Sequence, residues 1–495
     1  MTADIEAFER HLAELEATGL AGAPLFSGQA PPLLARAPGR LDVMGGFADY
    51  SGSLTLELPI AEAAFVAVQA TDRERVRIVS AGFGSDRGPV RDVAFPSLEL
   101  RRASRSYGDA YQYFRANTER AWAAYVAGAL VALRVELGVD IASGLDILVA
   151  SSVPEGKGVS SSAAVEVASF RALTALAGVE VDPAQAALWC QRIENRVVGA
   201  PCGVMDQMTS SCGSEGQLSA LLCQPATLEN RFPIPPDLAI WGVDSGIRHQ
   251  VSGADYTQVR VAAFMGYTII ARALGLPIEP GPEPGQVAIR DGTFRGYLAN
   301  VSVESFEREH AARLPERLSG EDFLREYGGI VDPITRVIPA TSYRVRAATA
   351  HPIYEHVRAS EFRTLMQGGS GRAGAARLGE LMYAAHESYG ACGLGSTGTD
   401  RLVELVRTAG PERGLYGAKI TGGGSGGTVA VLGASTAAAS VAAVALAYAR
   451  ESGHSPHLFS GSSPGAAQFG LARLVRAEGR WRVVHSAAPS AKGAT

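Results

Sequence analysis

The chain has 495 residues, more than a single hydrophobic core of usual size needs, so two domains are expected. Its hydrophobic fraction of 46% and charged fraction of 19% are typical of globular proteins and exclude a disordered composition. The formal net charge of −5 and a pI near 6.0 leave no basic surface, which argues against a nucleic-acid partner.

The cysteines and the apolar stretches are informative about the cellular compartment of the protein. Five cysteines form no CxxC pair and leave an odd one, so a reducing compartment fits better than a disulfide framework or a zinc site. Residues 3–17 carry apolar side chains at helical spacing among acids, which predicts an amphipathic helix and no signal peptide. The most apolar run, residues 437–449, is too short to span a bilayer and predicts a packed helix. We therefore expect a cytoplasmic protein without a membrane partner.

The run at residues 37–52, APGRLDVMGGFADYSG, follows a connector rich in proline and alanine at residues 30–37. A strand enters this run and a turn leaves it. The arrangement is expected to expose Arg40, Asp42 and Asp49 near one another. Further strands are predicted at residues 54–60 and 64–68, with strand-like fragments such as residues 76–79 after them.

A helix is predicted next, at residues 119–137. It carries Trp122 and Tyr125 three residues apart. Such an aromatic pair usually packs in a core, and it can also flank a flat ligand.

A glycine- and serine-rich turn at residues 154–164, PEGKGVSSSAA, separates a predicted strand (residues 144–152) from a predicted helix (residues 163–176). A proline and two glycines stop the strand, and three serines open the helix where its first N–H groups lack partners. Free amides, the positive helix end and small side chains together attract phosphate. An ordinary strand-to-helix loop with a serine cap is the alternative, and two further glycine-rich stretches favour phosphate binding.

The next two candidate residues, Glu194 and Asp206, are carboxylates for which both a structural and a functional role are open. A helix beginning at the Asp182-Pro183 cap runs to about residue 198, with Glu194 at the margin of its buried face. A surface carboxylate is the ordinary interpretation of Glu194. The irregular turn at residues 199–207 then delivers Asp206 at the start of a short helix, where capping is the ordinary role.

The sequence pattern changes near residues 233–236, where we place a domain transition. A strand, the run DSGIRH (residues 244–249) and a helix (residues 257–274) follow. Residues 276–285 are rich in proline and glycine and predict a surface loop, and residues 300–405 are mostly helical in pattern. The histidines in this part show no metal-ligand spacing, which favours structural roles.

The last glycine-rich stretch, GGGSGG at residues 422–427, leads into a predicted strand at residues 428–432. Its letters contain GxGxxG, but a dinucleotide fingerprint opens a helix within a βαβ unit, so that interpretation is rejected. No Walker-type GxxxxGK(S/T) occurs in the sequence. Residues 486–495 predict a loose tail.

Together the stretches at residues 37–52, 154–164 and 419–432 resemble, in order and spacing, the three motifs of the GHMP small-molecule kinases. The resemblance covers most of residues 36–265 and 380–435, and three ordered motifs make it specific. Within the family, the runs DVMGG, ADYSGSL, PEGKGVSSS and DSGIRH are most similar to the kinase domain of the L-arabinokinases.

The resemblance implies roles for individual residues. Asp206, within GAPCGVMDQ, falls at the catalytic aspartate of galactokinases, and Arg40 falls at the catalytic arginine. Ser162 and Glu194 fall at the positions that hold Mg²⁺ with the nucleotide phosphates. Sugar-contacting positions are implied for Gly46, Asp49, Cys202, Gly203, Asp255 and Tyr256. ATP-contacting positions are implied for Trp122, Tyr125, Pro154, Gly156, Lys157, Gly158, Ser160, Ser161, Ser162 and Ala163.

Phosphoryl transfer independently calls for these residue types. The reaction depends on positioning and on neutralising negative charge, and oxygen ligands such as those of Ser162 and Glu194 suit Mg²⁺. A carboxylate within hydrogen-bond reach can accept a proton from a sugar hydroxyl, and Arg40 beside Asp206 would keep that carboxylate ionised and oriented. We therefore expect ATP, Mg²⁺ and a small sugar to bind this protein.

One departure from the family concerns the sugar. Galactokinases follow the glycine at position 45 with Glu-His, and that glutamate reaches toward the 6-hydroxyl of galactose, whereas this chain has Gly46-Phe47. L-Arabinopyranose has the ring stereochemistry of galactose without the CH₂OH arm. A carboxylate at position 46 would stay unpaired over such a pentose, at a cost of roughly 1–3 kcal/mol. We therefore expect phosphorylation of L-arabinose at the anomeric hydroxyl.

Three alternatives stand beside this expectation. One is a galactokinase, or a kinase for another galacto-configured sugar, and a second is a galactokinase-like sugar sensor without turnover. The intact Ser162-Ala163 pair, together with Arg40, Asp206 and Glu194, argues against the sensor. The third, a structural protein whose glycine turns bind nothing, requires three coincidences.

The implied fold is α+β, with two domains of the GHMP kinase type. The resemblance implies an N-terminal domain like domain 2 of ribosomal protein S5, a ferredoxin-like C-terminal domain, and an active site in the cleft between them. The chain would then divide into an N-terminal helical segment (residues 1–30), an ATP-binding domain (residues 31–235), a C-terminal domain (residues 236–485) and a flexible tail (residues 486–495). The last strands of such proteins can return to the first domain.

Overall fold

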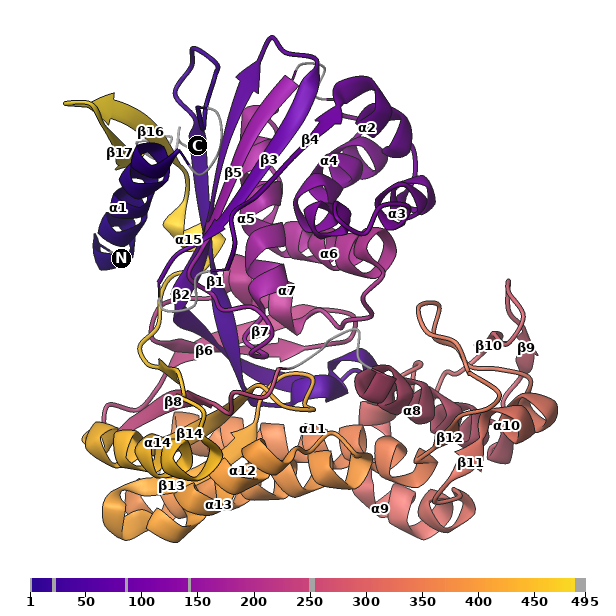
Figure 1. Ribbon diagram of the computed structural model, residues 1–495. Coiled ribbons are helices and arrows are strands. Elements are labelled where there is room, and N and C mark those ends of the chain that lie inside the picture. The colour runs from indigo at the N-terminus through magenta and orange to yellow at the C-terminus, as the bar shows by residue number, and fades with distance from the viewer. Residues whose placement is uncertain are drawn as a thin grey trace, which may run out of the picture.

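The computed structural model describes residues 2–19, 24–84, 88–140, 144–248, 254–369 and 371–485. Two sheets organise these residues, the larger in the upper half of the molecule and the smaller in the lower half (Figure 1). Helices pack on both sheets, so the architecture is that of the predicted α+β class.

The larger sheet contains strands from both ends of the chain. Its strands are β1 (Leu33–Met44), β2 (Leu54–Thr71), β3 (Arg75–Gly82), β4 (Arg91–Pro96), β5 (Gly144–Ser151), β6 (Gln217–Leu222), β7 (Thr227–Pro233), β16 (Ala472–Ala477) and β17 (Arg480–His485). Their order is β17-β16-β1-β2-β5-β3-β4, and β6 pairs with both β2 and β7. Within the described residues, β3 and β5 form the one parallel pair of this sheet.

The two faces of β2 point into different cores because side chains alternate along a strand. Val66 and Val68 face the helices of the upper half, and Phe65 faces the N-terminal helix, with which Phe8 stacks on it. These helices are α1 (Thr2–Thr18) on one face and α2 (Ser97–Ala103), α3 (Tyr107–Arg115), α4 (Ala124–Leu137), α5 (Ser161–Leu176) and α6 (Pro183–Ile193) on the other. Helix α7 (Met205–Cys212) packs against α6 and β1.

The smaller sheet has the order β13-β14-β8-β15 and is antiparallel. Its strands are β8 (Leu238–Asp244), β13 (Leu415–Ile420), β14 (Thr428–Ala434) and β15 (Leu458–Phe459). The helices of the lower half are α8 (Ala254–Ala273), α11 (Val345–Gly368), α12 (Gly371–Cys392), α13 (Thr397–Ala409) and α14 (Ala438–Ser452) (Figure 1). The glycine run joins β13 to β14 as a connection between antiparallel strands, which confirms that it is not a dinucleotide fingerprint.

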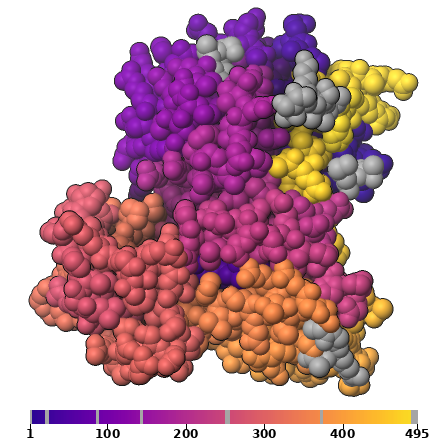
Figure 2. All heavy atoms as spheres, turned by 180° about the vertical axis from the view of Figure 1, so that it is seen from behind, coloured from indigo at the N-terminus to yellow at the C-terminus, as the bar shows by residue number. Residues whose placement is uncertain are grey.

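Residues 276–345 form a lobe that contacts α8 and α11, and Figure 2 shows it projecting from the body of the molecule in pink and salmon. Its elements are β9 (Ile278–Pro280), β10 (Val287–Ile289), α9 (Val303–Ser305), β11 (Leu318–Ser319), α10 (Gly320–Tyr327) and β12 (Ser342–Tyr343). The surface loop predicted at residues 276–285 therefore contains a short strand, β9, which pairs with β10.

Three boundaries differ from the sequence prediction. The connector predicted at residues 30–37 is largely strand, because β1 begins at Leu33. The two strands predicted at residues 54–60 and 64–68 are one continuous strand, β2. The last strands, β16 and β17, join β1 in the larger sheet, so residues 472–485 do not lie with the predicted C-terminal domain. The predicted tail at residues 486–495 lies outside the described residues.

Among the helices in the described part of the chain, none combines the length and the hydrophobicity needed to cross a membrane. The five cysteines are buried and unpaired, so their thiols contribute as small apolar side chains. Helix α14 confirms the helix predicted at residues 437–449, and it packs on the smaller sheet through Val441 and Trp241.

Candidate active site

A cavity of about 580 Å³ is lined by residues from both halves of the molecule. Most residues that the sequence nominated contribute to its wall, although they come from segments far apart in the chain. They are Arg40, Asp49, Trp122, Tyr125, Gly156, Gly158, Ser160, Ser161, Ser162, Glu194, Cys202, Gly203, Asp206 and Tyr256.

The start of α5 faces this cavity with its amides free of a side-chain cap. Ser160 occupies the position before the helix with φ 60° and makes no capping hydrogen bond. Its hydroxyl is buried without a partner although the residue lines the cavity. Residues other than glycine and asparagine rarely adopt a left-handed backbone conformation. Such strained residues concentrate at functional sites. The predicted serine cap is therefore absent at Ser160, which leaves the positive helix end available to an anion.

The three glycine-rich stretches meet at the Gly158 carbonyl and around Arg40. Arg40 Nη1 donates to the Gly158 oxygen at 2.8 Å. A Cβ atom on Gly422 would lie 2.9 Å from Arg40 Nη2, so the third stretch approaches this guanidinium with backbone alone. Thr428 Oγ1 donates to the Lys157 carbonyl at 2.8 Å, which joins the first strand after the glycine run to the turn at residues 154–164.

A β-bulge aims Arg40 into the cavity. The pairing of β1 with β2 shifts register between Pro38 and Arg40, and the Arg40 amide donates to the Val159 carbonyl at 3.1 Å. A Cβ atom on Gly39 would lie 2.6 Å from that same carbonyl oxygen, so only glycine allows the two segments to come this close.

Arg40 and Asp206 form a short ion pair at the cavity. Arg40 Nε donates to Asp206 Oδ1 at 2.9 Å, and Nη2 lies 2.7 Å from the same oxygen. Arg40 is buried, whereas the Asp206 side chain keeps 21% of its surface exposed. Glu57 of β2 lies behind the arginine, with its Oε2 3.4 Å from Arg40 Nε. Burial opposes the charge on Arg40, but the carboxylates of Asp206 and Glu57 outweigh it and raise the arginine pKa.

Glu194 enters the cavity from a π-helical turn, Glu194–Val198, that continues α6. Such turns interrupt helices and are frequent at functional sites. The carboxylate is buried, and its Oε2 accepts a hydrogen bond from Gln207 Nε2 at 2.5 Å. Burial and the nearby charge of Asp206 raise the pKa of Glu194 to about 7. A cation beside Glu194 would favour its ionised form.

Ser162 and Glu194 suit a magnesium ion that takes most of its ligands from phosphate. Both residues line the cavity, and the Ser162 hydroxyl opposes the rise in the pKa of Glu194. Within the described residues, no cluster of three or more His, Cys, Asp or Glu side chains could hold a metal by itself. Mg²⁺ commonly uses one or two protein oxygens together with substrate phosphates, so this small set of hard oxygen donors fits it.

Asp49 forms another part of the wall, on the short 3₁₀ turn Gly46–Ser51. Its carboxylate is buried and accepts a hydrogen bond from the Tyr50 amide at 2.7 Å. Burial and the charge of Asp206 raise the pKa of Asp49 to about 7, against the opposing effect of Arg260. A Cβ atom on Gly203 would overlap the Asp49 carboxylate, so this glycine lies directly against it.

Replacing Gly203 by alanine is therefore expected to displace Asp49 and to raise KM for the sugar by about tenfold or more, because small misplacements of binding groups are costly. Steady-state kinetics with saturating ATP measures this effect. Gly390→Ala is the matched control, since a Cβ atom there meets nothing within 4 Å and the backbone is helical. An unchanged sugar KM in Gly203→Ala would contradict the sugar-contacting role that the sequence resemblance implies for Asp49.

Trp122 and Tyr125 lie at the start of the predicted helix 119–137, which begins as a 3₁₀ turn before α4. Both side chains are half-buried and line the cavity instead of packing fully into the core. Arg91 of β4 lies 5.8 Å from the Trp122 ring and also lines the cavity. Both rings therefore border the cavity, which is compatible with the second interpretation of the pair.

Five nominated residues do not line the cavity. Pro154 and Ala163 are buried beside it, and Lys157 pairs through Nζ with Asp244 Oδ2 at 2.5 Å. Asp255 is exposed and accepts a hydrogen bond from Ser425 Oγ at 3.3 Å. Gly46 is buried, and its amide donates to Asp42 Oδ1 at 2.9 Å.

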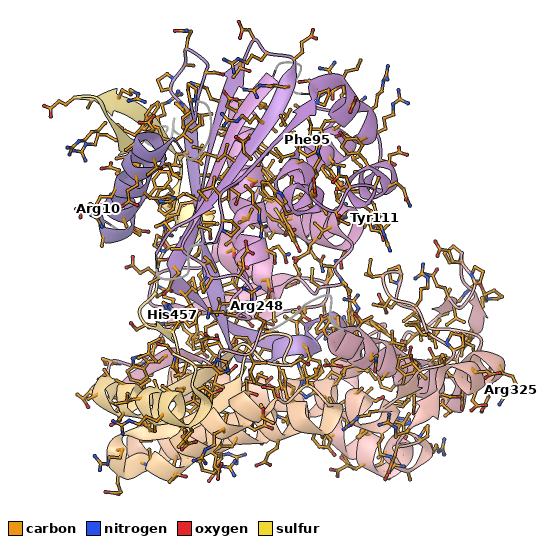
Figure 3. All side chains as sticks on the ribbon, in the orientation of Figure 1. Arg10, Phe95, Tyr111, Arg248, Arg325 and His457 are labelled. Carbon is orange, nitrogen blue, oxygen red and sulfur yellow. The ribbon has the colours of Figure 1, made fainter. Side chains whose placement is uncertain are left out.

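The structure also adds residues that sequence reasoning did not nominate. Arg248 is exposed, lines the cavity, and lies where the upper and lower halves meet (Figure 3). The run DSGIRH contains this arginine, and a planar guanidinium suits an anion. Glu57 had no signal, since its role depends on the register that places β2 beside β1.

Sequence profiles of known families match three parts of the chain. The GHMP kinases N terminal domain matches residues 124–214, and the GHMP kinases C terminal domain matches residues 372–452. The galactokinase galactose-binding signature matches residues 24–70, which contain Arg40 and Asp49.

Curated relatives point the same way. An L-arabinokinase of Arabidopsis thaliana is 43% identical over 494 residues, which cover 91% of this chain and 48% of the relative. The chain thus spans about half the length of that relative. Galactokinase of Chloroflexus aggregans is 29% identical over 86% of this chain and 91% of its own length.

Solved structures share the fold. Galactokinase of Lactococcus lactis, complexed with galactose, superposes with a TM-score of 0.68 at 19% identity, covering 92% of this chain and 98% of that one. Mevalonate kinase of Methanococcus jannaschii gives a TM-score of 0.50 at 12% identity, over 89% and 99% of the two chains.

An uncapped helix start and an arginine–aspartate pair at one cavity, with matches to both GHMP kinase domains, are the features of an ATP-dependent kinase. The chain carries matches to the N-terminal and C-terminal domains of the GHMP kinases together with the galactokinase galactose-binding signature, and its relatives are L-arabinokinases and galactokinases.

Proposed function

We propose that this protein is a sugar 1-kinase that transfers the γ-phosphoryl group of ATP to the anomeric hydroxyl of L-arabinose, giving L-arabinose 1-phosphate and ADP. The Arg40–Asp206 pair carries the proposal, because it faces the same cavity as the uncapped start of α5. A phosphate donor at the helix start and a hydroxyl acceptor at the carboxylate would meet beside this pair.

In the proposed reaction, the amides at the start of α5 bind the ATP phosphates, and Trp122 and Tyr125 flank the base. Asp206 accepts or orients the hydroxyl proton as the oxygen attacks the γ-phosphorus. Arg40 holds that carboxylate in place through two contacts and brings positive charge to the reacting phosphoryl group. Mg²⁺ bound near Ser162 and Glu194 would supply charge neutralisation on the phosphates.

The surroundings of Gly46 support a pentose. A Cβ atom on Gly46 would overlap the Tyr389 hydroxyl, and the backbone has φ +49°. Phe47 fills the next position by stacking on His351 at 3.9 Å between ring centroids. The position at which galactokinases carry a glutamate for the 6-hydroxyl therefore has no room for a side chain in this arrangement. A sugar without that hydroxyl leaves no group unpaired there.

D-Galactose is the second candidate substrate. The match of residues 24–70 to the galactokinase galactose-binding signature favours it, and so do the galactokinase relatives. Its ring hydroxyls have the same configuration as those of L-arabinopyranose, so Asp49 would serve both sugars. The two candidates differ in whether the site accepts the CH₂OH arm.

A sugar panel assayed for ADP release tests the proposal. We expect kcat/KM for L-arabinose to exceed that for D-galactose by about tenfold or more, the scale on which one extra substituent is discriminated. Phosphorus NMR of the product should show a phosphate on the anomeric carbon. A galactose preference would replace the first candidate with the second, and ADP release with neither sugar would contradict both.

A further inference from the structure

The 276–345 lobe contacts the part of the molecule that carries Asp49. Tyr297 of the lobe packs over Gly52, where a Cβ atom would lie 2.5 Å from the tyrosine ring. Gln224 Nε2 donates both to the Gly52 carbonyl at 2.9 Å and to Asn300 Oδ1 at 2.8 Å. Gly52 ends the short turn that holds Asp49, so the lobe touches that turn directly.

A buried ion pair makes a second connection. Asp332 of the lobe accepts hydrogen bonds from Arg260 Nε at 2.7 Å and from Arg260 Nη2 at 2.9 Å. The Asp332 carboxylate is also bound by Thr335 Oγ1 at 2.7 Å, and both charged residues are buried. A bidentate pair of this kind fixes the plane of the guanidinium as well as its position.

Arg260 carries this connection from α8 to the wall of the cavity. Its third nitrogen, Nη1, donates to the carbonyl of Cys202 at 3.1 Å, and Cys202 lines the cavity. The guanidinium also lies 5.2 Å from the ring of Tyr50, the residue after Asp49. Arg260 therefore supports two sides of the region assigned to the sugar, while none of these contacts reaches the turn at residues 154–164.

We propose that Asp332 is a positioning residue for sugar binding, acting through Arg260 on Cys202 and on the turn that carries Asp49. The lobe thereby holds the sugar-binding wall in place without lining the cavity. This inference rests on the proposed function, because it takes the sugar to bind beside Asp49. The 276–345 lobe would thus have a role in sugar binding, although within the described chain it contributes no residue to the cavity lining.

Asp332→Asn tests the inference, because the amide keeps the shape of the carboxylate but loses its charge and one acceptor. We expect kcat/KM for the sugar to fall by about 10–100-fold, mainly through KM, with KM for ATP unchanged. In an Arg260→Lys background, Asp332→Asn should add little further loss, since both changes break the same connection.

Asp291→Asn is the matched control. Asp291 also lies in the lobe, also binds α8, through the Tyr267 hydroxyl at 2.5 Å, and also accepts from backbone amides such as that of Phe294. It should lower the thermal midpoint without changing KM for the sugar. Equal KM changes in the two variants, a loss in Asp332→Asn confined to ATP, or full additivity with Arg260→Lys would each overturn the inference. Turnover of the wild-type protein reports separately on the proposed function.

Discussion

Replacing Asp206 by asparagine is expected to lower kcat by about 10²–10⁴-fold, the range typical for loss of a group that takes part in proton transfer. The change preserves the size of the side chain and one oxygen acceptor for Arg40, which donates to Asp206 Oδ1 at 2.9 Å. KM for ATP should stay close to that of the wild type, because Asp206 contacts the arginine and not the start of α5. Coupled measurement of ADP release gives kcat, and calorimetric titration gives ATP binding.

Asp237→Asn provides the comparison for this loss. Asp237 is exposed and does not line the active-site cavity, so its kcat should match that of the wild type. Equal turnover by wild type and Asp206→Asn would remove the carboxylate from the mechanism. A loss of ATP binding as large as the loss of kcat would show instead that Asp206 acts in assembling the nucleotide site.

Replacing Lys419 by methionine is expected to lower the free energy of unfolding by about 3–5 kcal/mol, because it leaves a buried carboxylate without its cation. Lys419 Nζ lies 2.5 Å from Asp42 Oδ2, and both side chains are fully buried. The same oxygen of Asp42 accepts from the Gly422 amide at 3.1 Å. The ion pair thus ties β1 of the larger sheet to β13 of the smaller sheet, and the Gly422 amide ties the glycine run to the same carboxylate. Urea unfolding followed by circular dichroism measures the loss.

The double variant Asp42→Asn/Lys419→Met distinguishes a lost charge partner from lost packing. Asparagine can still accept from the Gly46 amide, which donates to Asp42 Oδ1, while no unpaired charge remains. The double variant should therefore be clearly more stable than Lys419→Met alone. Equal stability of the two would mean that the ion pair contributes only through the packing of the lysine chain.

Local sequence signals predicted many elements because those signals act over a few residues. Asp182 caps α6 through the amides of Ala184 and Gln185, with proline at the first turn, as the cap pattern predicted. The alternation in residues 144–152 became β5, and the helix after the serine run became α5. Local signals failed at β1, where most of the connector predicted at residues 30–37 is strand and a bulge follows at Pro38.

Local sequence signals could not identify residues whose role depends on the pairing of segments far apart in the chain. Glu57 lies beside Arg40 because β2 pairs with β1, and Asp332 reaches Arg260 across 72 positions of the chain. Neither residue has a distinctive neighbourhood in the sequence. A buried partner becomes visible only when both strands or both segments have been placed.

The sequence by itself determined the resemblance to the GHMP kinases, the three glycine-rich motifs and the choice of Arg40, Asp206 and Glu194 as candidate site residues. Each motif consists of residues that are close together in the sequence, so its residue types and spacing can be recognised without the structure. Tertiary structure alone decided that these motifs share one cavity, that Gly46 has no room for a side chain, and that the last strands return to the first sheet. The physical reason is that these facts depend on burial and on contacts between distant segments, which form only when the two sheets and the lobe have packed together.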